Sequence, residues 1–249
     1  MRSEKKVLFG LVVSGLVLLS GVPGFSCDVN LVSLITGENP SDAFSLTIIK
    51  LASETRALGQ AISDPDTAKK NMVTLMKTWV EFDNRFSQTP PEWAKTDSEW
   101  NGKIKSVADF IGRINTDLQA GKTEMTHGKV LRLSEQIFHL LDTMPTGERQ
   151  KCLMRIFRRF VEFAEAFETQ DGKKFGEDLH ELSADISVLK TLMASGSENL
   201  MADLEGQVKQ LRELYQLDGA SLTMKVKYGY LGAEDCFKKM NENLRKGTK

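Results

Sequence analysis

The stretch KCLMRIFRRFVEFAEAFE, from Lys151 to Glu168, carries the pattern that decides the fold of this chain. Its large apolar residues recur at alternating steps of three and four, at Leu153, Ile156, Phe160, Phe163 and Phe167. This spacing places all five side chains on one face of an α-helix and most charged residues on the other. Such a helix buries its apolar face against other helices. The stretch therefore predicts a helical bundle.

The same spacing continues on both sides of this stretch, from Asp42 onward. It predicts seven further helices, whose apolar stripes start at Phe44, Met72, Trp100, Val130, Phe175, Leu200 and Val226. No segment shows the sustained alternation that is typical of a strand. We therefore predict an all-α fold, an antiparallel bundle of about eight helices, arranged as one bundle or as two stacked four-helix bundles.

Several local signals place helix starts and a domain boundary. Asp64 and Pro65 predict the start of the second helix, as cap and first-turn proline. Thr96 and Glu99 predict a capping box for the third helix. The segment MPTGER, residues 144–149, is the best internal boundary, and it divides the folded part into residues 42–145 and 146–249.

A short internal match suggests a duplication. WVEFDNRF (79–86) and FVEFAEAF (160–167) agree at four of eight positions. Three-helix units near residues 66–144 and 147–217 would then be copies of one another. Chance agreement between two amphipathic stretches is the alternative.

The N-terminal residues follow the pattern of a bacterial export signal. MRSEKK is basic, and an uncharged apolar run from Val7 to Ser20 follows it. That run is too short for a comfortable membrane span and has the length of a signal-peptide core. GVPGFSC then offers small residues for cleavage, so we predict a signal peptide over residues 1–26 and a tether over residues 27–41. The formal net charge is −1, and export together with the lack of a basic excess disfavours a nucleic-acid partner.

Cys27 directly follows the predicted cleavage point, and two interpretations stay open. In the first, the chain resembles a bacterial lipoprotein: the Cys27 thiol is acylated, the residue becomes the mature N-terminus, and the lipid contacts the membrane. Gly24 departs from that family's pattern, which has an aliphatic residue there. In the second, the signal is cleaved in the ordinary way and the cysteine is incidental.

The other two cysteines predict a disulfide. Export places the chain in an oxidising compartment, and acylation of Cys27 would leave Cys152 and Cys236 as an even pair. Both lie at the flank of the apolar stripe of their helix. We therefore predict a Cys152–Cys236 bridge between the fifth and the last helix, which an up-down bundle would make neighbours.

Basic residues gather at two places that could merge. Lys151, Arg155, Arg158 and Arg159 lie early in one helix, and Lys238 and Lys239 lie in the last helix. If the two helices are neighbours, these six residues could form a patch for an anionic partner or for lipid headgroups. The alternative is ordinary solvated charge.

Several motifs resemble those of the soluble cytochrome b and cytochrome c-prime four-helix bundles. They are the loop TPPEW (89–93), the turn QAGKT (119–123) and the helix end QIFHLL (136–141). The resemblance covers roughly Asp42 to Met144 and implies an antiparallel bundle that holds haem. The binding motif itself is absent, because the segment that would match C-x-x-C-H reads Cys236-Phe237-Lys238-Lys239-Met240.

Of the three histidines, only His139 could stand in for a haem ligand. Its helical phase is opposite the apolar stripe, so we expect it to be solvated, and the same holds for His180. No zinc or di-iron spacing and no catalytic motif occurs. The sequence thus predicts an exported, non-catalytic envelope protein without a cofactor that acts in binding or scaffolding. The alternative is a periplasmic haem-binding or redox bundle.

Overall fold

The computed structural model describes residues 28–37, 40–193 and 197–247. Within these ranges the chain forms nine α-helices, one short 3-10 helix (η1, Glu92–Ala94) and no strand, which confirms the all-α prediction. The helices are α1 (Val29–Thr36), α2 (Ala43–Ala61), α3 (Pro65–Phe86), α4 (Trp100–Gln119), α5 (Thr123–His139), α6 (Glu148–Thr169), α7 (Gly172–Leu192), α8 (Glu198–Leu217) and α9 (Met224–Gly247).

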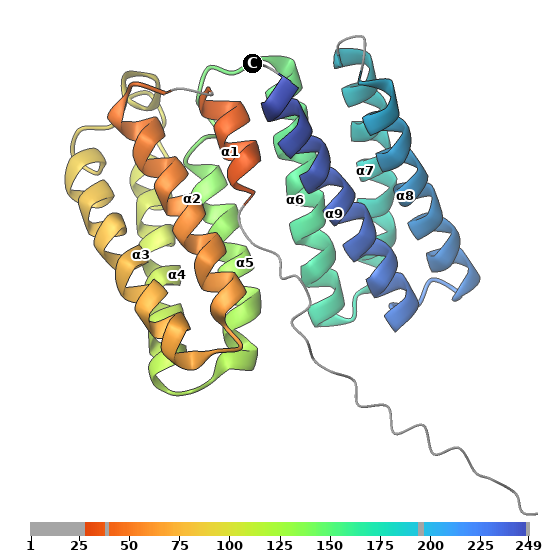
Figure 1. Ribbon diagram of the computed structural model, residues 1–249, viewed down its shortest axis with the longest axis horizontal. Coiled ribbons are helices and arrows are strands. Elements are labelled where there is room, and N and C mark those ends of the chain that lie inside the picture. The colour runs from red at the N-terminus through yellow and green to blue at the C-terminus, as the bar shows by residue number, and fades with distance from the viewer. Residues whose placement is uncertain (1–27, 38–39, 194–196, 248–249) are drawn as a thin grey trace, which may run out of the picture.

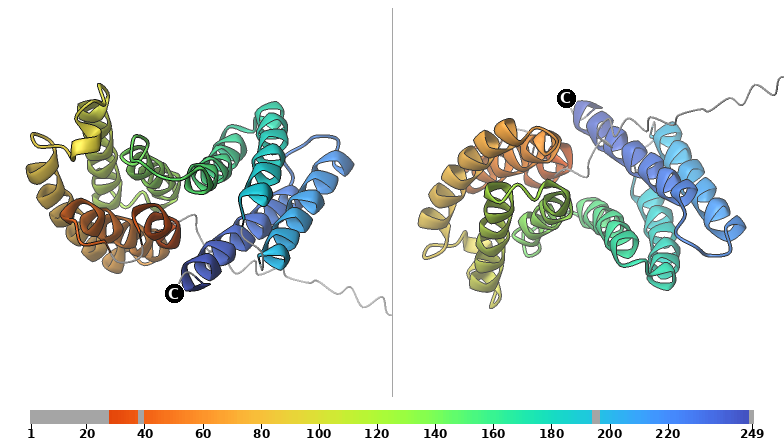
Figure 2. Two further views of the ribbon diagram at one scale, coloured as in Figure 1. Left: turned by 90° about the horizontal axis from the view of Figure 1, so that it is seen from above. Right: turned by 90° about the horizontal axis from the view of Figure 1, so that it is seen from below.

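The helices form two halves that lie side by side (Figure 1, Figure 2). In the first half α2 packs on α3, α4 packs on α5, and α2 also contacts α5. In the second half α6 packs on α7 and α8 packs on α9. α5 contacts α6 across the boundary predicted at residues 144–149. Buried apolar residues run through both halves, so the two halves share one hydrophobic core.

α1 corrects the prediction of a tether over residues 27–41. Leu31 and Val32 are fully buried in this helix, and Leu34 and Ile35 are nearly so. α1 contacts α2, α6 and α9 and lies between the two halves (Figure 1). In the second half α6 and α9 contact each other only weakly, and α1 packs mainly on α9, with an equally weak contact to α6. Four large apolar side chains within five residues bury enough surface to hold this short helix in place.

The helix pairing also corrects the predicted three-helix repeat. The close pairs α2–α3 and α4–α5 correspond in order to α6–α7 and α8–α9. α2 therefore matches α6 in its place within a half, whereas the sequence match joins α3 to α6. The four identical positions of segments 79–86 and 160–167 reflect two amphipathic helices with similar apolar stripes.

An aromatic cluster lies in each half. In the first half the ring centroid of Phe44 lies 5.6 Å from that of Phe82 and 5.2 Å from that of Trp93. Trp100 donates its indole N–H to the carbonyl oxygen of Phe86 at 2.9 Å, which ties the start of α4 to the end of α3. In the second half the rings of Phe160, Phe163, Phe175, Tyr230 and Phe237 join α6, α7 and α9.

Candidate functional site

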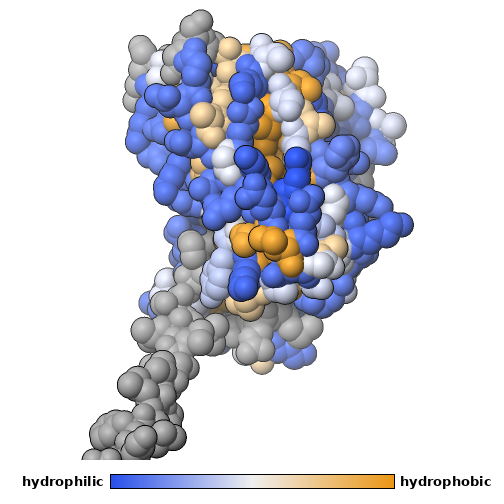
Figure 3. Space-filling model, turned by 90° about the vertical axis from the view of Figure 1, so that its right-hand side faces the viewer, coloured by the Kyte–Doolittle hydropathy of each residue, from blue (hydrophilic) through white to orange (hydrophobic). Residues whose placement is uncertain are grey.

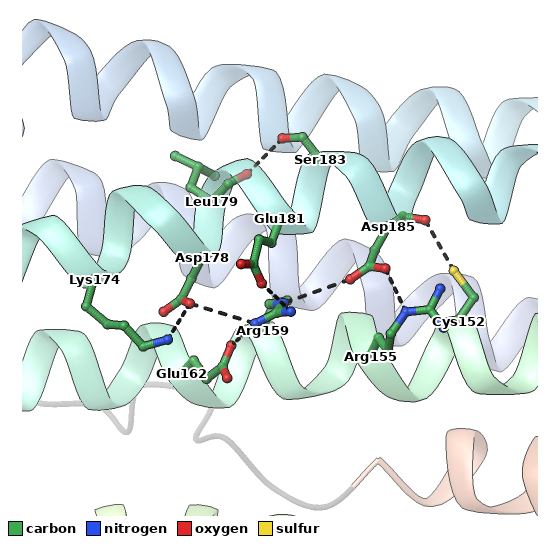
Figure 4. A network of polar contacts seen from close by, with 10 residues as sticks. All are labelled: Cys152, Arg155, Arg159, Glu162, Lys174, Asp178, Leu179, Glu181, Ser183 and Asp185. Atoms are coloured by element: carbon green, nitrogen blue, oxygen red, sulfur yellow. Dashed lines mark hydrogen bonds and ion pairs between the residues drawn. The ribbon is translucent and has the colours of Figure 1, made fainter.

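A network of charged side chains crosses the contact between α6 and α7 (Figure 4). Its members recur at steps of three or four on both helices, which places them on the two facing surfaces. They are Arg155, Arg159 and Glu162 on α6, and Lys174, Asp178, Glu181 and Asp185 on α7. The network was not predicted, because the sequence analysis considered only the basic members.

Arg159 is the centre of the network (Figure 4). Its guanidinium nitrogens lie 2.7 Å from Glu162 Oε2, 3.8 Å from Asp178 Oδ1 and 3.9 Å from Asp185 Oδ2. It also forms an ion pair with Glu181. One cation therefore lies within ion-pair distance of four carboxylates, three of them from the neighbouring helix.

Asp178 is the most deeply buried carboxylate of this network, at 1% exposure. Lys174 Nζ donates to its Oδ1 at 2.7 Å, while Asp178 Oδ2 has no hydrogen-bond partner. Burial raises the pKa of the Asp178 carboxyl, and the hydrogen bond from Lys174 only partly opposes this. Arg155 Nε donates to Asp185 Oδ1 at 2.8 Å and completes the contact. The network holds α7 in one register on α6 through charge pairs at fixed heights.

A second polar cluster joins α1 to α9, and of its members only Lys238 was named from the sequence. Asp28 caps α1, and its Oδ1 accepts from the backbone N–H groups of Asn30 and Leu31. Its Oδ2 accepts from Asn241 Nδ2 at 2.7 Å, a contact between residues 213 positions apart. Glu234 lies two turns before Asn241 and pairs with Lys238 at 2.6 Å. Helical phase could have found Glu234 and Asn241, because both lie beside the apolar stripe of α9.

Burial controls the charges of this second cluster. Asp28 is 3% and Glu234 is 6% exposed. Burial raises the pKa of the Asp28 carboxyl, although the hydrogen bonds that it accepts oppose the shift. Burial also raises the pKa of Glu234 to about 6, against the attraction of Lys238.

His139 belongs to a third charged cluster, which corrects the prediction of a solvated side chain. Its side chain is 31% exposed, with Nδ1 3.0 Å from Asp142 Oδ2 and Nε2 3.8 Å from Glu135 Oε1. The hydrogen bonds to Asp142 and Glu135 raise the pKa of His139 to about 9. The imidazole is thus protonated at neutral pH and is a poor ligand for haem iron. His180 is exposed, as predicted.

The six basic residues predicted as an anion-binding patch each have a carboxylate partner. On α6, Arg155 and Arg159 belong to the network with α7, and Arg158 pairs with Asp142. The remaining pairs are Lys151–Glu148 at 2.8 Å, Lys238–Glu234 at 2.6 Å and Lys239–Asp235 at 2.6 Å. The α6 group and the α9 group are neutralised separately and do not form one unpaired basic surface.

The two described cysteines are free, so the predicted Cys152–Cys236 disulfide is wrong. Cys152 faces α7, where its thiol donates to the carbonyl oxygen of Asp185 at 3.2 Å. Cys236 lies on α9 within the electrostatic influence of Asp203 of α8. The two thiols thus point to different neighbouring helices. Burial raises the pKa of both thiols, which lowers their reactivity.

Two sequence predictions fall on parts of the chain that are not described. Cys27, the predicted lipidation residue, and the predicted signal peptide lie outside the described residues. The side chain of His127 also lies outside them.

The described surface has hollows of moderate size, and one of about 550 Å³ lies between α4 and the end of α5, lined by Lys103, Gln136, His139 and Asp142 among others. A groove of about 280 Å³ lies between α7 and α8, with Ile186 and Val208 among its lining residues. Figure 3 shows that face, on which hydrophilic residues flank narrow apolar areas. A cavity of about 310 Å³ lies where α5, α6 and α9 meet, lined by Leu131, Phe167 and Met224 among others. The groove and this cavity lie near the lower end of the usual range for ligand pockets, whereas the hollow beside His139 lies within that range.

No group of three or more His, Cys, Asp or Glu residues in the described part of the chain is placed to hold a metal ion. Among the described helices, none combines the length and the apolar character needed to cross a membrane. Comparisons with protein-family models, with curated proteins and with solved structures find no match to this chain.

Proposed function

We propose that this protein is an exported, non-catalytic helical-bundle protein of a bacterial cell envelope that acts in binding or scaffolding. One observation carries the proposal: the cap of the first helix, Asp28, follows the expected cleavage point after Ser26 by a single residue. A cleavage there removes the signal and leaves every described helix intact. Mature residues then begin at Cys27, whose thiol is either acylated or free.

The non-catalytic role is supported by how the charged side chains are used. The most buried carboxylates, Asp178 and Asp28, pair with Arg159 of α6 and Asn241 of α9, contacts that hold one helix against another. His139 is held between Asp142 and Glu135 as a cation. These arrangements stabilise the bundle, and the His139–Asp142 pair that lines the hollow beside α4 is itself an ion pair.

Fractionation in a bacterial host tests the proposal. The full chain with a C-terminal tag should be recovered from the envelope or periplasm, with the mass of a chain that begins at Cys27, with or without a diacylglyceryl group. The matched control is Leu16→Arg, which interrupts the apolar signal run and should keep the chain in the cytoplasm at full length. Cytoplasmic recovery of the unmodified full chain would contradict the proposal.

A visible absorption spectrum of the purified protein tests the haem alternative. The proposal expects only the ultraviolet absorption of aromatic residues. A Soret band that copurifies with the protein would instead favour a cytochrome-like function.

A further inference from the structure

The cavity where α5, α6 and α9 meet has mainly apolar walls. Its lining includes Leu131 of α5, Ala164 and Phe167 of α6, and Leu222 and Met224 around the start of α9. Leu131 and Ala164 are buried, whereas Met224 is 58% exposed. One end of the cavity therefore lies against the shared core and the other lies at the surface. Such walls favour an aliphatic ligand, because burial of apolar surface drives its binding.

One cation at this cavity lacks a counter-charge. Lys227 of α9 lines the cavity, is half-buried and forms no ion pair with a described residue. Thr223 and Met224 also line the cavity at the N-terminal end of α9, where the helix dipole adds positive potential. An anionic group of a ligand would be attracted by the lysine and by the helix end together.

Glu168 is the one carboxylate among the described lining residues, and it is engaged on another side of the cavity. It pairs with Arg132 of α5 at 3.6 Å. Its side chain lies against Gly128 of α5, where an added Cβ atom would overlap with Glu168 Oε1. The glycine thus lets the carboxylate lie at the α5 wall, beside a cation of α5. Lys227 of α9 remains the charge of the cavity without a partner.

We propose that this cavity binds a medium-chain aliphatic carboxylate, with the chain between Leu131 and Phe167 and the carboxylate on Lys227. At about 30 Å³ for each water-sized group, a volume of about 310 Å³ holds roughly ten such groups. A methylene group is of similar size, so decanoate is the probe that fills the cavity. The flexible side chain of Met224 can adapt to the ligand at the surface end. The inference names a ligand class for the binding role proposed above, and it rests on that role rather than on export.

Calorimetric titration with decanoate tests the proposal. The tagged chain recovered from the bacterial host is titrated near pH 7 with decanoate and, in parallel, with the neutral decanol. We expect saturable binding of one decanoate to each chain. Lys227→Met keeps an aliphatic side chain and removes the charge, so it should weaken decanoate binding about tenfold, as for the loss of a charged hydrogen bond. The same change should alter decanol binding by less than about twofold.

Lys225→Met is the matched control for the loss of one positive charge. Lys225 lies on the same turn of α9, is exposed and does not line the cavity. This change should leave the affinity for decanoate within about twofold of that of the parent. An equal loss of affinity in Lys225→Met and Lys227→Met would overturn the proposal, because it would show a general effect of surface charge.

Two further measurements locate the ligand. Ala164→Phe places a ring in the cavity and should abolish decanoate binding, with a urea transition that shows the variant to be folded. In the parent, affinity should rise from hexanoate to decanoate and then level off at tetradecanoate, because the cavity is full. Retained binding in Ala164→Phe would overturn the proposal. So would an affinity that keeps rising to tetradecanoate, a result that decides the matter if Ala164→Phe fails to fold.

The titration separates this inference from the export proposal. Failure of the parent chain to bind decanoate would overturn the inference and leave export intact. Recovery of the unmodified full chain from the cytoplasm would overturn export, and the same titration on that chain would still decide whether the cavity binds the carboxylate.

Discussion

The two halves of the molecule differ in how their first and last long helices are held together, α2 with α5 and α6 with α9. In the first half α2 contacts α5 directly, and aromatic residues such as Phe44 and Phe82 fill the contact between helices. In the second half α6 and α9 meet through a few ring contacts such as that of Phe160 with Phe237, and α1 packs on α9 beside them. Of the four carboxylate residues buried in the described part of the chain, Asp28, Asp178 and Glu234 belong to α1 or to the second half.

This difference shows what apolar packing and buried charge each contribute to the position of a helix in the bundle. Apolar stripes favour burial, and cores tolerate changes of apolar side chains that conserve volume, so an apolar pattern alone specifies helix positions less strictly. A buried charge pair is favourable in only one register, because a shift leaves each partner without its counter-charge. We infer that apolar contacts close the first half, and that buried charges also determine the positions of α1 and α7 in the second half.

Removing a large aromatic side chain from the second core should have the largest effect. Phe160 is 2% exposed and packs against Phe163 and Phe237. We expect Phe160→Ala to reduce the free energy of unfolding by about 3–5 kcal/mol, measured by urea denaturation. The matched change in the first half, Phe82→Ala, should have a similar effect. Val188→Ala, at a side chain that is 44% exposed, should change the stability by less than ~0.5 kcal/mol.

Leu31→Ala tests whether α1 is part of the second half. Leu31 is fully buried, so we expect a loss of about 2–4 kcal/mol. Hydrogen exchange should rise more in α9, which α1 contacts, than in α3. Leu46→Ala, at a leucine that is 53% exposed on α2, is the control and should have little effect. Equal increases in exchange in both halves would remove the distinction between them.

Two changes in the α6–α7 network should have unequal effects. Arg159→Met leaves four carboxylates without their shared cation, and we expect a loss of about 2–4 kcal/mol. Asp178→Asn should cost less, because burial already disfavours the charged form of this carboxyl. The difference between Arg159→Met and the parent should shrink as the pH is lowered, because burial raises the pKa of Asp178 and its protonation removes one of the negative charges around Arg159. A larger loss for Asp178→Asn than for Arg159→Met would contradict this account.

The helical architecture could be predicted because it depends on local spacing. Every apolar stripe that was used to define a helix lies on a helix in the structure, and Asp64 caps α3 with Pro65 in its first turn as predicted. The Thr96–Glu99 capping box does not form. Asp97 instead accepts from the backbone N–H of Glu99, because η1 and the following turn set a different backbone path.

The contacts between distant segments could not be predicted in the same way. The pairing of Asp28 with Asn241 depends on where α1 lies, and its five-residue apolar segment is too short to show a helical period. The Cys152–Cys236 bridge was predicted from the order of an up-down bundle. That order holds, because α6 and α9 are in contact, but the thiol of Cys152 donates to Asp185 of α7 and so does not face α9. The acidic partners of Arg159 are present in the sequence. That they lie around one guanidinium group depends on how α7 packs on α6, which the sequence pattern does not show.

The smallest expected effects are pH dependences, which should differ between the junction of the halves and the α1–α9 contact. The folded pKa of His139 is raised to about 9 from an ordinary value near 6.5. Between these values the folded chain holds a proton that the unfolded chain has lost, so the free energy of unfolding falls as pH rises. Glu234, raised to about 6 from 4.5, gives the same sign in a lower window, from about pH 4.5 to 6. The urea midpoint of the parent should fall with rising pH in both windows. His139→Gln should abolish this fall only between about pH 6.5 and 9, and Glu234→Gln only between about pH 4.5 and 6. Loss of both slopes in one variant would show that the two clusters titrate as a single unit.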